Sequence, residues 1–231
     1  MTDLSPLQNR FLDLLLSSGA LRFGEFKTKS GRYSPYFMNT GAFDHGRLLR
    51  DVARCYAEFI DLTFSGPAHL YGPAYKGITL AAATAMELSA IRSVEVPFTF
   101  NRKEAKGHGE GGVFVGRKPR VECPLLIVED VMTGGTSIRE TMEILAPMKI
   151  TVRGVVIGVD RQERGETDLA AAAEVTKKFG CPVKAILTMD EIIKALWFSN
   201  KPVERLGKIW IDDSIKARID SYRESWGPVS S

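Results

Sequence analysis

Two adjacent acids and a loop of glycines and hydroxyls are the residues best suited to chemistry. Glu129 and Asp130 follow the apolar run 125–128, and Thr-Gly-Gly-Thr-Ser occupies 133–137. Glycines let the backbone approach a ligand, and the amides at a helix start can hold a phosphate together with nearby hydroxyls. The loop supplies three hydroxyls, those of Thr133, Thr136 and Ser137. The two acids lie at the carboxyl end of the expected strand, where α/β sheets bind ligands. They could accept hydrogen bonds from a pair of vicinal hydroxyls. A phosphate beside a diol describes a ribose 5-phosphate.

The alternative for this segment is an ordinary strand-to-helix turn without a ligand. Ser137 and Glu140 have the spacing of a capping box, which predicts a helix over 137–145 that begins with a side-chain cap. The segment is not a Walker A loop, because no Gly-Lys-Ser/Thr follows the glycines. Two acids and three hydroxyls around one turn favour the ligand-binding interpretation.

A second candidate is the basic, glycine-rich stretch 101–112, which separates two expected strands. It contains four basic side chains, those of Arg102, Lys103, Lys106 and His108. A loop of this length and charge can close over a highly charged anion such as pyrophosphate. The alternative is a solvated hairpin tip. Gly107, Gly109 and Gly112 match GxGxxG, the fingerprint of a dinucleotide site. Such a site needs a strand before the motif and a helix after it. Here a polar loop precedes the motif and an expected strand follows it, so a dinucleotide site is not expected.

Three further segments carry side chains suited to a flat anionic ring. Tyr36 and Phe37 lie near Lys29, although these aromatics could equally pack against each other in an N-terminal hood. Lys76 opens an expected helix, where a cation opposes the helix dipole unless an anion is near. Arg161 follows a strand and could grip a carboxylate. Its alternative is a surface salt bridge to Asp160 or Glu163.

Alternating strands and helices predict an α/β fold with a mainly parallel sheet. Expected strands cover 70–71, 94–100, 113–115, 125–128, 152–159 and 183–187. Expected helices cover 7–16, 48–59, 77–88, 137–145, 169–179 and 191–197. A turn-rich stretch covers 24–46. We expect one domain over 1–231, with an N-terminal helix and base-binding hood (1–46), a core (47–200) and a polar C-terminal tail (201–231).

Composition excludes several classes of protein. The 231 residues are 44% hydrophobic and 26% charged, which is ordinary for a globular protein and not for a disordered one. The net charge of +3 is too small to indicate a nucleic-acid or membrane partner. Apolar runs are short, the N-terminus lacks a signal-peptide pattern, and the three cysteines are widely spaced. A cytoplasmic protein with reduced cysteines is expected.

Residues 125–137 resemble the phosphoribosyl pyrophosphate signature of type I phosphoribosyltransferases. With other segments in the same order, the stretch 21–165 resembles the orotate phosphoribosyltransferases. Those segments are Lys-Ser-Gly-Arg (29–32), Ser-Pro-Tyr-Phe (34–37), Gly-Pro-Ala-Tyr-Lys-Gly (72–77), the stretch 101–112 and Asp-Arg-Gln-Glu-Arg (160–164). The chain departs from the family pattern at Glu129, where many members have aspartate, and at Gly107, where the family often has an acid.

The resemblance implies a type I phosphoribosyltransferase-like fold, with a twisted sheet, a small hood and a β-hairpin lid loop. It implies transfer of phosphoribosyl from phosphoribosyl pyrophosphate to orotate, giving orotidine 5′-phosphate and pyrophosphate in UMP synthesis. Mg²⁺ would be held mainly through substrate, with no direct protein ligand. The implied partners are these substrates and a second copy of the chain, whose lid loop would enter the neighbouring site. The chain is long enough for the transferase alone.

The resemblance also implies roles for single residues. Catalytic roles fall on Lys103, Arg102, Lys106, His108, Asp130 and Glu129. Phosphoribosyl pyrophosphate would bind Lys29, Tyr75, Lys76, Arg102, Lys103, Lys106, His108, Glu129, Asp130, Val131, Met132, Thr133, Gly134, Gly135, Thr136 and Ser137. Orotate would bind Tyr36, Phe37, Thr133 and Arg161. Two alternatives stay open: a transferase for another base, and a non-catalytic regulator that binds phosphoribosyl pyrophosphate.

Overall fold

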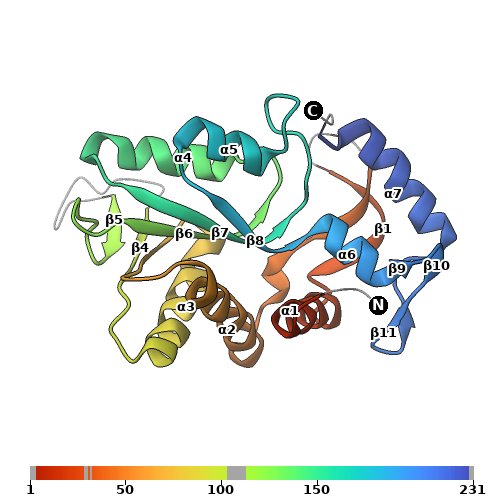
Figure 1. Cartoon of the computed structure of the whole chain (residues 1–231), viewed down its shortest axis with the longest axis horizontal. Helices are drawn as coiled ribbons and strands as arrows, with labels where there is room; N and C mark the ends of the chain where they lie inside the picture. The colour runs from red at the N-terminus through yellow and green to blue at the C-terminus, as the bar shows by residue number, and fades with distance from the viewer. Residues whose placement is uncertain (1–3, 29–30, 32, 103–112, 229–231) are drawn as a thin grey trace.

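The structure, a computed structural model, is organised around a six-stranded sheet (Figure 1). It describes residues 4–28, 31, 33–102 and 113–228. The strands are β3 (His69–Gly72), β4 (Phe98–Asn101), β5 (Phe114–Gly116), β6 (Leu125–Met132), β7 (Val152–Asp160) and β8 (Val183–Thr188). They are ordered β5-β4-β3-β6-β7-β8. All neighbours pair in parallel except β4 and β5, which are antiparallel. The predicted mainly parallel sheet is confirmed, with the antiparallel strand β5 at one edge.

Helices cover both faces of this sheet, because β6 and β7 are apolar on both sides. Leu126 and Val128 pack in the core below, and Leu125 and Ile127 pack in the core above. The lower layer in Figure 1 contains α1 (Pro6–Ser17), α2 (Gly46–Thr63) and α3 (Lys76–Arg92). The upper layer contains α4 (Thr136–Leu145), followed by a 3₁₀ turn (Ala146–Met148), and α5 (Ala171–Phe179). This arrangement brings the carboxyl ends of β3, β6 and β7 to one edge.

The N-terminal segment forms a hairpin where the sequence indicated only turns. The strands β1 (Leu21–Lys27) and β2 (Tyr33–Met38) pair antiparallel. Their register shifts between Phe23 and Phe26, and this irregularity breaks the alternation that would have revealed a strand. A short 3₁₀ turn, Thr40–Ala42, then leads to α2. The hairpin carries the side chains expected near the base.

The C-terminal segment is ordered and packs against the rest of the chain. After α6 (Met189–Leu196) come two short hairpins, β9 (Trp197–Phe198) with β10 (Lys201–Pro202) and β11 (Glu204–Arg205) with β12 (Lys208–Ile209). Arg205 fastens this region to α1 through Asp13, with an Nε–Oδ1 distance of 2.6 Å. The last helix, α7 (Asp213–Trp226), contacts β2 (Figure 1). Residues far apart in sequence therefore meet beside the hairpin.

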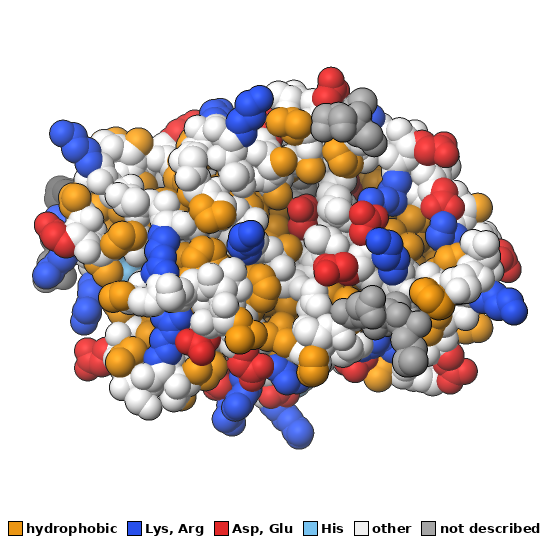
Figure 2. Space-filling view, viewed as in Figure 1, with side chains coloured by type: hydrophobic (Ala, Val, Ile, Leu, Met, Phe, Trp, Pro, Cys, Tyr) orange, Lys and Arg blue, Asp and Glu red, His pale blue; other side chains and the backbone are white. Residues whose placement is uncertain are grey.

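The surface agrees with the small net charge. On the face drawn in Figure 2, acidic and basic side chains are interspersed, and no single basic patch dominates it. Within the ranges that the structure describes, no helix is long and apolar enough to cross a membrane.

Candidate active site

A pocket lies at the carboxyl end of β6, between the starts of α3 and α4. Its volume is about 290 Å³, and residues 73–76 and 129–138 line it. The predicted phosphate loop, both acids, Tyr75 and Lys76 therefore share one cavity. Val131 and Met132 also line it, as the last residues of β6. These two residues would contact a ligand through their backbone atoms, and their side chains shape the wall of the pocket.

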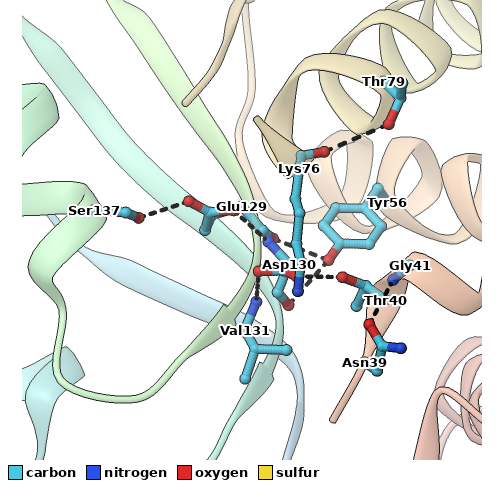
Figure 3. Close-up of polar contacts among 10 residues, drawn as sticks. All are labelled: Asn39, Thr40, Gly41, Tyr56, Lys76, Thr79, Glu129, Asp130, Val131 and Ser137. Carbon is cyan, nitrogen blue, oxygen red and sulfur yellow. Dashed lines mark hydrogen bonds and ion pairs between the residues drawn. The ribbon is translucent and has the colours of Figure 1, made fainter. Parts of the chain in front are cut away.

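Glu129 is buried beneath the loop (Figure 3). Its side chain is 6% exposed, and its Oε2 accepts a 2.6 Å hydrogen bond from the hydroxyl of Ser137. Its Oε1 accepts from the amide of Asp130 at 3.0 Å. Burial, reinforced by the charge of Asp130, raises the pKa of Glu129 to about 7. Glu129 is thus a carboxyl that can carry or release a proton near neutral pH.

Asp130 lies on the opposite side of the same strand. Its Oδ2 is 3.3 Å from Nζ of Lys76 and accepts from the hydroxyl of Thr40 (Figure 3). Tyr56 holds the strand below, because its hydroxyl donates to the carbonyl of Glu129 at 3.0 Å. The two acids, adjacent in sequence, therefore have different partners and different electrostatic surroundings.

The loop that follows is shaped by Gly135. It is the residue preceding α4 and has φ of 74°, a left-handed conformation that favours glycine. No side chain caps this helix, so the predicted capping box of Ser137 and Glu140 is wrong. The Ser137 hydroxyl instead donates to Glu129. The first-turn amides lack a side-chain cap and lie beside Thr133 and Thr136, an arrangement that could hold an anion.

Lys76 begins α3, as the sequence predicted. A lysine there opposes the helix dipole, and Asp130 supplies the compensating charge. The first turn of α3 lies very close to the end of β3, since a Cβ added to Gly72 would lie 2.1 Å from the carbonyl oxygen of Gly77. Only glycine at position 72 permits this approach. The tight turn brings Lys76 over the end of β6.

Arg161 lies at the end of β7 and is buried rather than at the surface. Its Nε and Nη2 donate to Oε1 of Glu163, at 2.8 and 2.5 Å. Its guanidinium carbon is 4.9 Å from the ring centre of Tyr36. Tyr36 is 1% exposed, and its ring packs against the guanidinium of Arg161. The ion pair with Glu163 does form, but inside the protein.

Phe37 projects from the other side of β2. Its ring stacks on that of Phe26, with ring centres 5.4 Å apart. The guanidinium carbon of Arg22 lies over the Phe37 ring, 5.3 Å from its centre. Successive strand residues face opposite ways, so Tyr36 and Phe37 have different neighbours, Arg161 for Tyr36 and Phe26 for Phe37. Thr133 lines the main pocket, and Arg102 lines a neighbouring cavity of about 640 Å³ at the end of β4. Lys29, Lys103, Lys106 and His108 lie outside the described residues.

Several side chains at the site were not singled out from the sequence. They are Ser34, Thr40, Tyr56 and Tyr222, and Glu163 appeared only as a possible salt-bridge partner. Thr40 and Asp130 are 90 positions apart, and Tyr222 and Glu163 are 59 apart. Their contacts depend on tertiary packing, so no local spacing could have revealed them.

The fold and the pocket define a class of protein. The profile of the phosphoribosyl transferase domain matches residues 40–186. That range begins at Thr40 and includes β3, α3, β6 and the loop before α4, which are the elements that form the pocket. This chain is a phosphoribosyltransferase.

Full-length relatives narrow the class. An orotate phosphoribosyltransferase of Clostridium beijerinckii is 43% identical over 222 residues, or 95% of this chain and 97% of that protein. One from Laribacter hongkongensis is 44% identical over 97% of this chain and 99% of its own length. The crystal structure of the orotate phosphoribosyltransferase from Francisella tularensis aligns with a TM-score of 0.77 at 34% identity, covering 94% of this chain and 98% of that one. The chain belongs to the orotate phosphoribosyltransferase family.

The fold alone does not select the base. The adenine phosphoribosyltransferase of Leishmania tarentolae aligns with a TM-score of 0.51 at 15% identity, covering 80% of this chain and 90% of that one. Specificity must therefore come from side chains that differ on a shared scaffold.

Proposed function

We propose that this chain joins orotate to phosphoribosyl pyrophosphate, releasing orotidine 5′-phosphate and pyrophosphate for pyrimidine synthesis. The observation that carries the proposal is one pocket that combines an uncapped helix start, two acids and a lysine at the end of β6. The family relationship indicates the base. One domain is proposed for the whole chain, with hood 1–46, core 47–200 and tail 201–231.

The uncapped start of α4 would hold the 5-phosphate. Amides of the loop 133–137 and the hydroxyls of Thr133 and Thr136, which line the pocket, would supply the donors. Glu129 and Asp130 would accept from the two ribose hydroxyls. Because Lys76 is 3.3 Å from Asp130, pyrophosphate arriving at Lys76 would draw its ammonium away and release Asp130 to the sugar.

In the reaction, N1 of orotate forms a bond to C1 of the ribose as the bond from C1 to pyrophosphate breaks. The electron pair leaves with pyrophosphate, and the N1 proton passes to the released pyrophosphate or to water. Positive charge develops on the sugar, and the carboxylates of Glu129 and Asp130 would stabilise it. Lys76 and Arg102 would neutralise the leaving group. We assign the same role to Lys103, Lys106 and His108, which lie outside the described residues.

Orotate carries a carboxylate that a base-specific site should recognise. Arg161 would meet that carboxylate, Thr133 would contact the ring edge, and Phe37 and Lys29 are proposed to lie near the base. Tyr36 is proposed to contact orotate as well, next to the guanidinium of Arg161 that its ring touches.

Mg²⁺ is proposed as the cofactor, held mainly through substrate oxygens. Among the residues that the structure describes, no group of three or more His, Cys, Asp or Glu could hold a metal ion. The pocket offers the carboxylates and hydroxyls that Mg²⁺ prefers, in a number that leaves room for substrate phosphates. When bound, Mg²⁺ would neutralise pyrophosphate charge, and Asp130 and Glu129 would orient the ribose.

The proposed assembly is a cytoplasmic homodimer in which the lid loop of one subunit completes the site of the other. A test of the whole proposal is pyrophosphate release with orotate, uracil, hypoxanthine and adenine in parallel. Release with orotate alone is expected. Pyrophosphate release with a purine and not with orotate would show that orotate is not the substrate base, while the proposed phosphate site would stand.

A further inference from the structure

One oxygen of Glu163 collects several donors around the guanidinium of Arg161. Its Oε1 accepts from Arg161 Nε and Nη2 at 2.8 and 2.5 Å and from the Tyr222 hydroxyl at 3.1 Å. The Tyr36 hydroxyl lies 3.5 Å from the same oxygen. Glu163 is 3% exposed and Arg161 is 7% exposed, so this cluster is fixed in the protein interior.

This arrangement decides which edge of Arg161 remains for a ligand. A guanidinium presents donors on defined edges of a rigid plane. Glu163 takes the edge formed by Nε and Nη2, and Ser34 Oγ accepts from Nη2 at 3.3 Å. Nη1 makes no hydrogen bond to a described residue, so it is the donor left to meet a carboxylate. The direction of that donor depends on Glu163.

The last helix, α7, holds Glu163 from the other side. Tyr222 is 6% exposed and packs edge-to-face on Tyr36, with ring centres 5.6 Å apart. The next residue, Arg223, forms a 2.6 Å ion pair with Asp190 at the start of α6. The amide of Arg164 donates to the carbonyl of Trp226 at 3.0 Å. These contacts join the C-terminal helix to the segment that follows β7.

We infer that Glu163 and Tyr222 are positioning residues for the base, acting through Arg161, and that α7 is thereby part of the specificity apparatus for a base that carries a carboxylate. The inference rests on the proposed function and deepens it. Glu163 fixes the guanidinium plane, and Tyr222 fixes Glu163. Neither side chain needs to touch the substrate.

Two conservative variants test this without removing bulk from the core. Glu163→Gln keeps the shape but loses the charge that orders the guanidinium, and Tyr222→Phe removes one hydroxyl. Loss of a buried charged partner should raise the orotate KM by about tenfold or more, and loss of the hydroxyl by about threefold. The KM for phosphoribosyl pyrophosphate should change less than about twofold, since its groups lie in the β6 pocket.

Matched controls use exposed residues nearby. Glu224→Gln on α7 and Tyr33→Phe on β2 repeat the same chemical changes at exposed side chains. Both should keep the wild-type orotate KM. Uracil, which lacks the carboxylate, serves as a competitive probe. Its inhibition constant should be the same in Glu163→Gln as in the wild type, because it makes no use of Arg161.

A double variant tests whether Glu163 works through Arg161. In an Arg161→Ala background, Glu163→Gln should produce no further rise in the orotate KM. A further tenfold rise in the orotate KM of the double variant would overturn the inference. A fall in the orotate KM of the single variant Glu163→Gln would also overturn it, because Glu163 would then compete with orotate for Arg161. If Glu163→Gln fails to fold, Tyr222→Phe decides alone: an unchanged orotate KM overturns the inference. Absence of orotate turnover in the wild-type protein would instead refute the proposed function.

Discussion

Glu129 and Asp130 are neighbours in the chain, but their carboxyl groups have different partners and different surroundings. Glu129 faces Ser137 inside the fold, and Asp130 faces Lys76 and Thr40. Burial raises the pKa of Glu129 to about 7, whereas Asp130 has a cation beside it. The two carboxyl groups therefore suit different tasks. Glu129 orders the loop, and Asp130 would be released from Lys76 when an anion binds that lysine.

The raised pKa of Glu129 predicts a pH dependence of stability. Below its ordinary pKa of 4.5, Glu129 is protonated in both the folded and the unfolded chain. Between 4.5 and about 7 only the unfolded chain loses this proton, so the folded state loses stability as pH rises through that window. Glu129→Gln removes this dependence. Urea unfolding should show wild type losing stability relative to the variant by at most about 1.4 kcal/mol per pH unit.

Titrating groups that do not interact with Glu129 cancel in this comparison. His69, whose pKa burial lowers to about 4, is present in both proteins and contributes equally. Parallel stability curves for wild type and Glu129→Gln between those pH values would show that Glu129 ionises normally in the fold.

A second prediction at the residue scale concerns Asp130. Asp130→Asn removes a charge that would stabilise the developing positive charge on the sugar, and should lower kcat/KM by about 10²–10³. Thr40→Ala, which removes one contact to that carboxylate, should lower kcat/KM by about threefold to tenfold. Steady-state kinetics would measure both. Equal effects of the two variants would contradict a direct role for Asp130.

Among the elements, the loop before α4 shows how far local sequence rules extend. The strand, the glycines and the helix over 137–145 were predictable, because apolar runs and breakers mark them. The capping box was not formed, because the Ser137 hydroxyl had a buried carboxylate as a competing partner. Likewise, the β1–β2 hairpin was missed because its irregular register disrupts alternation, and the ordering of α7 depends on tertiary contacts such as Tyr222 with Glu163.

Gly135 offers a prediction at this scale. An alanine there would adopt φ of 74°, with its Cβ 3.1 Å from Val175 and 3.2 Å from Arg139. Gly135→Ala should lower the free energy of unfolding by about 1–2 kcal/mol and raise the KM for phosphoribosyl pyrophosphate by about tenfold. Gly134→Ala is the control for stability, since its Cβ would meet nothing within 4 Å. A Gly135→Ala protein as stable as Gly134→Ala would contradict this account of the loop.

For the whole molecule, the sheet and its two layers bring residues from five regions to one edge. The hood supplies Thr40, the crossover after β3 supplies Lys76, and β6, β7 and α7 supply the rest. The order of elements was predictable from alternating strands and helices. The meeting of α7 with the segment after β7 was not, because it joins positions 59 residues apart.

Shared sites predict complementation between inactive variants. Lys103→Ala damages the proposed lid, and Asp130→Ala damages the pocket. If the lid acts on the partner, a hybrid dimer has one intact site, and an equal mixture should regain about a quarter of wild-type activity. Subunit exchange would be verified by mass spectrometry of differently labelled chains. Exchange without regained activity would show that each lid serves its own subunit.

Orotate turnover by this enzyme can be followed through the absorbance of orotate over time with phosphoribosyl pyrophosphate and Mg²⁺. We expect a fall in orotate absorbance that requires both additions, with no reaction of uracil or hypoxanthine under the same conditions. A constant orotate signal, together with measurable binding of phosphoribosyl pyrophosphate, would contradict the account and indicate a binding protein on this fold.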